Sequence, residues 1–157
     1  MKKLFVFSDT HRNIQLIRSI ENIAKESDYV IHLGDYTTDV LYLKDVLGKK
    51  LICVKGNGDF ISGYPDETEL EDEGVKIFIT HGHRYNVKKT LLNIGNEALR
   101  RECNAVLYGH THCADITKYA GVSLINPGSF FASKTGVYSY CYIILWKGKI
   151  IPKIVEL

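Results

Sequence analysis

The sequence of 157 residues lacks any apolar run long enough to act as a membrane helix or a secretory signal, and it has little net charge. The first apolar segment, residues 4–7, follows Lys2 and Lys3. A signal peptide needs an apolar stretch of ~7–15 residues and a membrane helix needs ~20. Twenty Lys and Arg against eighteen Asp and Glu leave a charge of +2, and the basic residues form scattered pairs. We therefore expect no membrane partner, and we find no strong nucleic-acid signature.

The sequence also lacks the cysteine spacing of a redox or zinc motif. None of its four cysteines forms a C-x-x-C pair, and Cys53 and Cys141 lie in apolar runs, where cysteine is usually a small buried hydrophobe. This usage indicates a reduced, cytoplasmic protein.

No linker, internal repeat or low-complexity tract interrupts the chain, which predicts a single domain over residues 1–157. The hydrophobic fraction of 45% and the charged fraction of 24% are ordinary for a globular protein, which excludes a disordered, collagenous or coiled-coil chain. A domain of this length buries ~70% of the surface that its unfolded chain exposes. Because such a core needs no metal to fold, any bound metal would serve chemistry.

Short apolar segments alternate with helical patterns early in the chain, and successive strands follow later, so we expect an α/β fold whose last part is mostly β. The expected strands cover residues 4–7, 29–33, 51–54, 75–80, 105–108, 116–119, 122–125, 137–146 and 150–155, with a short edge strand near 68–70. The expected helices cover 14–24 with Asn13 as N-cap, 40–47 ending at Gly48, and 87–98 after Asn86.

Polar residues follow five of these strands, and in four of the five segments they lie next to glycine. The residues concerned are Asp9, His11, Asp35, Asn57, His81, His83, His110 and His112. Because ligands bind beyond the carboxyl ends of the strands in an open α/β sheet, these side chains should meet on one rim. His32 lies within a strand instead, and we expect it to be a packed core residue.

Each of these segments has an ordinary explanation when taken alone. An Asp at a strand end is as often a helix cap, and G-H-x-H can be a polar turn. Together they favour a metal site, in which carboxylate, amide and imidazole ligands without thiolate suit Mn²⁺, Fe²⁺, Ni²⁺ or Zn²⁺. There are more ligands than one tetrahedral ion needs, and a carboxylate such as Asp35 can bridge two ions. Two ions ~3.5–4 Å apart can bind phosphoryl oxygens and deprotonate a water molecule, which indicates a binuclear hydrolase.

The order D-x-H, G-D, G-N-x-D, H-G-H and G-H-x-H resembles the calcineurin-like metallophosphoesterase superfamily. The chain length, the opening over residues 8–11 and the Asn-Pro-Gly-Ser segment at 126–129 look most like its small YfcE-type phosphodiesterase branch. The resemblance implies a four-layer fold, in which a β-sandwich of two mixed sheets is flanked by helices. It also implies a phosphodiesterase that hydrolyses a small phosphodiester with a metal-activated hydroxide.

The resemblance further implies roles for individual residues. One ion would be held by Asp9, His11 and His112, and the other by Asn57, His81 and His110, with Asp35 bridging them. His83 and Arg12 would lie near the substrate phosphate. The candidates for a direct catalytic role are His83 and Asn57. Of the two divalent ions expected per chain, Mn²⁺ is the first choice, with Ni²⁺, Fe²⁺, Zn²⁺ and Mg²⁺ as alternatives.

Two positions depart from the pattern of many phosphatases in the superfamily. Gly58 stands where those enzymes have a histidine that protonates the leaving oxygen, and Thr38 stands where they have an aspartate that orients it, with Asp39 one residue later. The YfcE-type branch also lacks this histidine. Gly58 therefore disfavours a phosphomonoesterase or protein phosphatase.

Other questions stay open at this point. A non-catalytic scaffold similar to the retromer subunit of this fold is the main alternative, and the intact ligand positions argue against it. The segment over residues 126–129 is either a turn that supports the site or a plain Pro-Gly turn. The loop over residues 60–73 either shapes a specificity pocket or is a surface loop or an oligomer contact, so a homo-oligomer is not excluded.

Overall fold

The computed structural model describes residues 1–131 and 136–157. Its strands are β1 (Lys2–Phe7), β2 (Tyr29–His32), β3 (Leu51–Cys53), β4 (Glu67–Asp72), β5 (Val75–Thr80), β6 (Ala105–Leu107), β7 (Asp115–Tyr119), β8 (Val122–Asn126), β9 (Ser139–Trp146) and β10 (Lys149–Glu156). Its α-helices are α1 (Ile14–Ser19), α2 (Glu21–Glu26), α3 (Leu41–Leu47) and α4 (Leu92–Arg100). Short 3₁₀ turns lie at Thr37–Val40, Gly48–Lys50 and His83–Tyr85.

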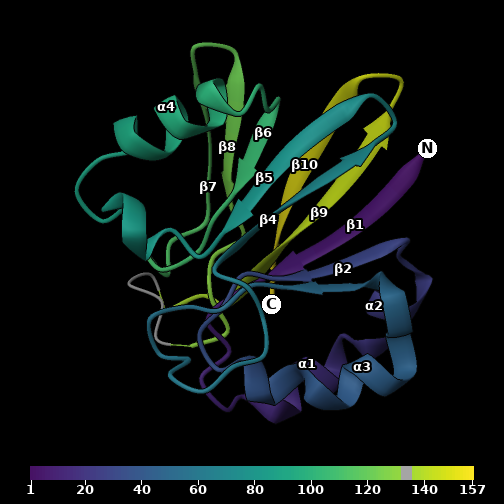
Figure 1. Cartoon of the computed structure of the whole chain (residues 1–157). Helices are drawn as coiled ribbons and strands as arrows, with labels where there is room; N and C mark the ends of the chain where they lie inside the picture. Colours follow the sequence, from purple (N-terminus) through teal and green to yellow (C-terminus); the bar gives the residue numbers. More distant parts are fainter. Residues whose placement is uncertain (132–135) are drawn as a thin grey trace.

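The strands form two five-stranded mixed sheets of similar design (Figure 1). The first has the order β10-β9-β1-β2-β3, with parallel pairing among β1, β2 and β3 and antiparallel pairing of β9 with both β1 and β10. The second has the order β4-β5-β6-β8-β7, with parallel pairing among β5, β6 and β8 and antiparallel outer strands. The predicted sandwich of two mixed sheets is confirmed.

Three apolar clusters separate four layers. The central cluster fills the space between the sheets and includes Val6 and Ile77. A second cluster packs Ile17 of α1 and neighbouring helical residues against the outer face of the first sheet, and a third packs Ile94 of α4 against the outer face of the second. Figure 1 shows the same arrangement, with α1, α2 and α3 on one side and α4 on the other. The predicted flanking helices are therefore confirmed.

Strand β1 shows why the sequence forms these layers. Leu4 and Val6 point into the central cluster, whereas Phe5 and Phe7 point into the helix-covered cluster, and all four are fully buried. A strand that is covered on both faces reads as a continuous apolar run rather than an alternating one. His32, at the end of β2, is also fully buried, as expected for a packed core residue.

Two helices differ from the prediction. The segment 14–24 is not one helix but two, α1 and α2, which meet at Ile20. The Ser19 hydroxyl donates to the Leu16 carbonyl at 2.7 Å, a local bond of the kind that competes with helix continuation. The helix expected from Val87 begins only at Leu92, because the preceding residues form turns after Asn86, whose backbone is left-handed. Asn13 does cap α1, since its side chain accepts from the Leu16 amide.

The second sheet also has a longer edge than predicted. The edge strand expected near residues 68–70 is β4, which pairs with β5 over the whole of Glu67–Asp72. The turn joining β9 and β10 has Lys147 and Gly148 at φ 47° and 76°, the positive values that tight hairpin turns require.

None of the helices among the described residues has the length and apolar character of a membrane-spanning segment.

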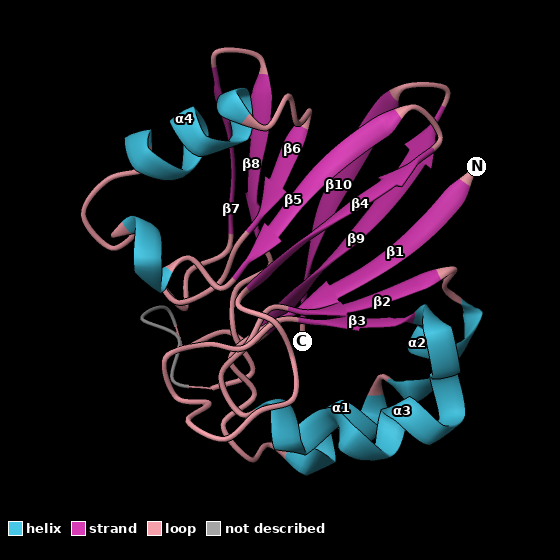
Figure 2. Cartoon of the chain, viewed as in Figure 1, coloured by secondary structure: helices cyan, strands magenta, loops and turns pink. Residues whose placement is uncertain are grey.

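The parallel strands of both sheets end on the same side of the molecule. Figure 2 shows the loops that follow β1, β2, β3, β5 and β6 gathered at one end of the sandwich. This convergence brings together segments that are up to a hundred residues apart in the sequence.

Candidate metal centre

The polar residues predicted to meet on one rim do follow the strand ends. Asp9 and His11 come after β1, Asp35 after β2 and Asn57 after β3, in the first sheet. His81 and His83 come after β5, and His110 and His112 after β6, in the second sheet.

Several of these residues have a left-handed backbone, which non-glycine residues seldom adopt. The φ angles are 53° at Asp9, 41° at His11, 60° at Asp35, 69° at His110 and 58° at His112. Such conformations are costly and persist where the surrounding structure holds them, typically at functional sites. Here they turn the chain sharply at the strand ends and aim the side chains inward.

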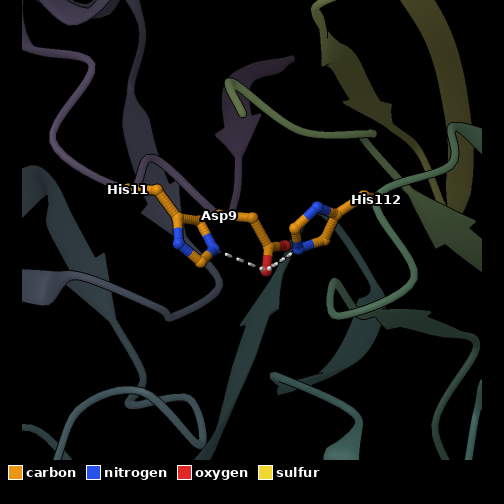
Figure 3. A group of neighbouring side chains, drawn as sticks. All are labelled: Asp9, His11 and His112. Atoms are coloured by element: carbon orange, nitrogen blue, oxygen red, sulfur yellow. Dashed lines mark ion pairs between the residues drawn. The ribbon is translucent and has the colours of Figure 1, made fainter. Parts of the chain in front are cut away.

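The first ligand group consists of Asp9, His11 and His112 (Figure 3). The Asp9 Oδ1 atom lies 3.1 Å from His112 Nε2 and 3.9 Å from His11 Nε2. The candidate ligand atoms of this group lie within 4.8 Å of one another. One carboxylate and two imidazoles at this separation are a suitable donor set for a transition-metal ion.

The second ligand group consists of Asp9, Asp35 and His81, all of them buried. His81 Nε2 lies 3.6 Å from Asp35 Oδ1 and 4.0 Å from Asp9 Oδ1. Asn57 extends this group, because its Oδ1 atom lies 3.2 Å from His81 Nε2. The other ring nitrogen of His81, Nδ1, lies 2.8 Å from the Leu33 carbonyl oxygen, the kind of partner that orients a metal-binding histidine.

Asp35 lies between the two groups. Its Oδ2 atom is 3.7 Å from His11 Nε2, while its Oδ1 atom faces His81 and accepts a hydrogen bond from the Gly58 amide at 2.8 Å. Gly56 is needed for this approach, because a Cβ at that position would lie 2.2 Å from Asp35 Oδ1. Each oxygen of one carboxylate therefore faces a histidine of a different group.

Two atoms at the centre have the environment that a cation would satisfy. Asp9 Oδ1 and His11 Nε2 are buried and make no hydrogen bond within the described residues. A buried polar atom without a partner is costly, and an unfilled ion site is a recognised reason for one. The other Asp9 oxygen, Oδ2, accepts from the Ser8 hydroxyl at 2.6 Å and from the His110 amide at 3.1 Å. The residues present thus fit a divalent metal.

The ionisation of Asp9 agrees with this interpretation. Burial opposes the charged carboxylate, but the adjacent imidazoles of His11 and His112 and the Ser8 hydroxyl outweigh it and hold the pKa of Asp9 well below its usual range. Asp9 is therefore an anion throughout the physiological pH range.

His110 and His83 lie beside the two groups. The His110 ring is 5.0 Å from the His81 ring, and burial lowers its pKa to about 4, so it is neutral and able to bind a metal. The His83 ring is 5.4 Å from His81 and 6.1 Å from His110. Arg12 is exposed, and its guanidinium carbon lies 5.5 Å from the centre of the Tyr36 ring.

The Asn-Pro-Gly-Ser segment supports the site. The buried Asn126 side chain donates to the carbonyl of Gly109 at 3.0 Å, and the Ser129 hydroxyl donates to the carbonyl of Asp9 at 3.1 Å. These hydrogen bonds tie the turn to the loops that carry Asp9 and His110, as the supporting interpretation predicts.

Sequence reasoning assigned no role to two carboxylates that organise the loops. Asp39 accepts from the Thr10 hydroxyl at 2.8 Å and from the Arg12 amide at 2.6 Å. Asp59 accepts from the amides of Thr37 and Gly56 at 2.8 and 2.9 Å. The sequence signals for them were the last position of the G-N-x-D motif for Asp59 and, for Asp39, a place one residue after the position of the orienting aspartate in related phosphatases.

Comparison with known proteins agrees with this geometry. The family model described as the calcineurin-like phosphoesterase superfamily domain matches residues 1–147. A probable metallophosphoesterase, YsnB of Bacillus subtilis, is 35% identical over 130 residues, which cover 80% of this chain and 73% of that protein. Phosphodiesterase MJ0936 of Methanocaldococcus jannaschii is 28% identical over 153 residues, which cover 86% and 88%.

The fold is also shared with more distant structures. A crystal structure of Vps29 from Entamoeba histolytica has a TM-score of 0.78 at 17% identity, with 99% of both chains covered. That likeness concerns the fold alone. The family match, together with the ligand groups at the strand ends, shows that the chain belongs to the calcineurin-like phosphoesterase superfamily, a family of metal-dependent phosphoesterases.

Proposed function

We propose that this protein is a binuclear metal-dependent phosphodiesterase that hydrolyses a small phosphodiester. The observation that carries this proposal is the convergence of Asp9 and Asp35 with His11 and His81. At its centre, Asp9 Oδ1 and His11 Nε2 make no hydrogen bond to any residue that the structure describes. The similarity to a protein named phosphodiesterase supports the choice of reaction.

The proposed ligand sets are those that the family resemblance implies. The first set is the first group, and the second set shares His81 with the second group. Asp9, His11 and His112 hold one ion in this proposal. Asn57, His81 and His110 hold the other, and Asp35 bridges them. The approach of each Asp35 oxygen to a different histidine, at 3.7 and 3.6 Å, supports the bridging role. When bound, two divalent ions would polarise the phosphoryl oxygens and lower the pKa of an attacking water molecule. Mn²⁺ is the proposed ion, with Ni²⁺, Fe²⁺, Zn²⁺ and Mg²⁺ as alternatives.

His83 and Arg12 are assigned to the substrate phosphate. The Nδ1 atom of His83 is buried and makes no hydrogen bond within the described residues, and burial lowers the pKa of this histidine. His83 is therefore neutral at pH 7 and can exchange a hydrogen bond or a proton with a bound phosphoryl group. The exposed guanidinium of Arg12 can pair with a phosphoryl oxygen.

The preference for diesters over alkyl monoesters follows from Gly58. This residue has no side chain to protonate a departing alkoxide, a step in which a positioned general acid contributes ~10²–10⁴-fold. An aryl leaving group needs little such help, because its oxygen carries negative charge readily. The best substrates should therefore be diesters with a stable leaving group.

The test is hydrolysis of an aryl diester, an aryl monoester and an alkyl monoester after chelation and addition of each metal singly. We expect the aryl diester to be cleaved best with Mn²⁺, and metal analysis to approach two ions per chain. Faster cleavage of alkyl monoesters would refute the diester preference, and one ion per chain in the active enzyme would refute the binuclear centre.

A non-catalytic scaffold is the second candidate, because the fold is shared with Vps29. Folded protein that retains no metal and hydrolyses none of the esters would favour it. We further propose that residues 1–157 act as one domain in the cytoplasm, in keeping with the four free cysteines.

A further inference from the structure

Two aromatic side chains pack against the imidazole of His11. The Phe131 ring is stacked on it, with centroids 4.5 Å apart and an interplanar angle of 23°. The Tyr36 ring lies 4.7 Å away at 44°. Both aromatic side chains come from loops that follow strands other than the one preceding His11.

The contacts around His11 differ in kind from those around His81. A metal-binding histidine usually donates its second ring N–H to a carboxylate, a carbonyl or water, which fixes the orientation of the ring. His81 has the Leu33 carbonyl at 2.8 Å for this purpose. Within residues 1–131 and 136–157, His11 Nε2 makes no hydrogen bond, and the rings of Phe131 and Tyr36 are in position to hold the imidazole in its orientation.

Both aromatic residues are themselves anchored through the backbone. The Phe131 amide donates to the Ser129 hydroxyl at 2.9 Å, and that hydroxyl donates to the Asp9 carbonyl. The Tyr36 carbonyl accepts from the Asp39 amide at 2.9 Å, and the Asp39 carboxylate accepts from the Arg12 amide. Each ring is therefore tied to the loop that carries His11.

The exposure of Phe131 argues against a simple core role. Its side chain is 45% exposed, far more than the fully buried Phe130 next to it. A large aromatic residue left half in water contributes less to the core than its size allows. Its contact with His11 is the feature that distinguishes it from other exposed apolar residues, such as Phe60.

We propose that Tyr36 and Phe131 are positioning residues that clamp the His11 imidazole, so that its Nε2 atom stays aimed at Asp9 and Asp35. The clamp sets the affinity of the metal site to which His11 belongs. The inference rests on the proposed metal centre and deepens it, because it identifies residues outside the ligand set that determine metal binding.

The test compares variants that remove a ring with variants that keep one. Phe131→Leu and Tyr36→Leu remove the contact, Phe131→Tyr and Tyr36→Phe preserve it, and Phe60→Leu is the matched control at an exposed site. Each chelated protein is titrated with Mn²⁺ by calorimetry. The histidine ring proton signals of each metal-free protein are recorded by NMR, with His11→Gln used to assign the His11 signals.

We expect the leucine variants to weaken one of two Mn²⁺ binding steps by ~10–100-fold, the usual effect of losing a residue that orients a ligand. The other step should not change. The His11 signals should move toward the position of an exposed histidine, since the ring current of the neighbour is lost. The ring-keeping variants and Phe60→Leu should behave like the wild type.

Unchanged Mn²⁺ binding and unchanged His11 signals in both leucine variants would overturn the clamp. A wild type that binds two ions but cleaves no ester would refute the proposed function, while the calorimetry would still decide the clamp. If the wild type binds fewer than two ions, the binuclear proposal fails and the His11 signals alone decide: a shift supports the clamp and no shift overturns it.

Discussion

The two ligand groups use similar residue types but are held in place in different ways. In the group around His81, the histidine is fully buried, Asp35 is 5% exposed, and both are hydrogen-bonded to backbone. In the group around His11, the side chains of His11 and His112 are 20% and 21% exposed, and aromatic rings pack against His11. Asp9 belongs to both groups.

This difference indicates how one candidate metal site can combine a rigid half with a half that a substrate can reach. Hydrogen bonds from buried backbone fix an imidazole in direction as well as in place, and they are strongest where water is excluded. Ring stacking tolerates partial exposure, because it depends on contact rather than on a dry environment. We therefore expect the His81 side to be preorganised and the His11 side to face the incoming substrate.

The largest effect should come from Asp35→Asn, which alters the residue between the two groups. Loss of the bridging charge should lower diesterase kcat/KM by ~10³-fold, since metal ions contribute several kcal/mol of charge stabilisation. The circular dichroism should stay nearly unchanged, because asparagine can still accept from the Gly58 amide. Asp45→Asn, at an exposed site, is the control. Retention of most activity would mean that Asp35 does not bridge.

A second buried histidine, His32, contacts the loop that carries His11, through Thr10. The Gly34 amide donates to His32 Nδ1 at 3.3 Å, which leaves the proton on Nε2, 3.4 Å from the Thr10 hydroxyl oxygen. Burial lowers the pKa of His32 from 6.5 to about 4, so the folded protein holds it neutral.

His32 should therefore make the folded protein sensitive to acid. The unfolded chain binds the proton more readily, so this stabilisation is complete above pH 6.5 and is lost as the pH falls toward 4. The loss should reach ~3 kcal/mol in the free energy of unfolding. His32→Gln should flatten this part of the profile, measured by denaturant titration with a chelator present. The low pKa of His110 leaves a residual slope in both proteins. Parallel profiles for the two proteins would show that His32 does not contribute.

Sequence reasoning could predict those features of the two groups that follow from a local residue pattern. Asp9, Asp35 and His81 could be predicted to lie together because each comes within a few residues of the end of an apolar strand, and parallel strands end on the same side of a sheet. The doubly buried strands were recognisable for the same reason, as continuous apolar runs such as residues 4–7.

What sequence reasoning missed depends on contacts between distant residues. Nothing near Phe131 in the sequence indicates that its ring would lie on His11, 120 positions earlier, or that Asp39 would bond the Arg12 amide. The break at Ser19 was missed because a single hydroxyl bond outweighed a regular apolar spacing.

A substitution at Gly56 should disturb the packing around Asp35, which belongs to the same group as His81. We expect its free-energy cost to be smaller than that of the changes at Asp35 or His32. A Cβ at Gly56 would lie 2.2 Å from Asp35 Oδ1 and 2.6 Å from the Asp35 backbone nitrogen, so the backbone itself must shift. Gly56→Ala should therefore destabilise the protein by ~1–3 kcal/mol, as overpacking usually does. Gly63→Ala is the matched control, because nothing lies within 4 Å of its Cβ. Thermal unfolding measures both, and equal melting temperatures would mean that the two loops are not tightly packed.

The smallest effect is expected from Gly58→His, which adds the imidazole that many related phosphatases have. A Cβ at this position would lie 3.2 Å from Asp35 Oδ1, so Asp35 must move by a few tenths of an ångström to accept it. The position that orients this imidazole in those phosphatases is Thr38, which has no carboxylate, and the neighbouring Asp39 already accepts from Thr10 and Arg12.

Alkyl monoesterase activity of the Gly58→His variant should therefore rise only several-fold, well short of the ~10²–10⁴-fold of a positioned general acid. Aryl diester cleavage should change little, because that leaving group needs no proton. Gly58→Ala separates the effect of the imidazole from that of the added Cβ. Steady-state kcat/KM for an alkyl monoester and an aryl diester measures the change. If the wild type already cleaves the alkyl monoester faster than the aryl diester, another residue supplies the proton, and His83 is the first to substitute, because its buried Nδ1 has no hydrogen-bond partner within the described residues.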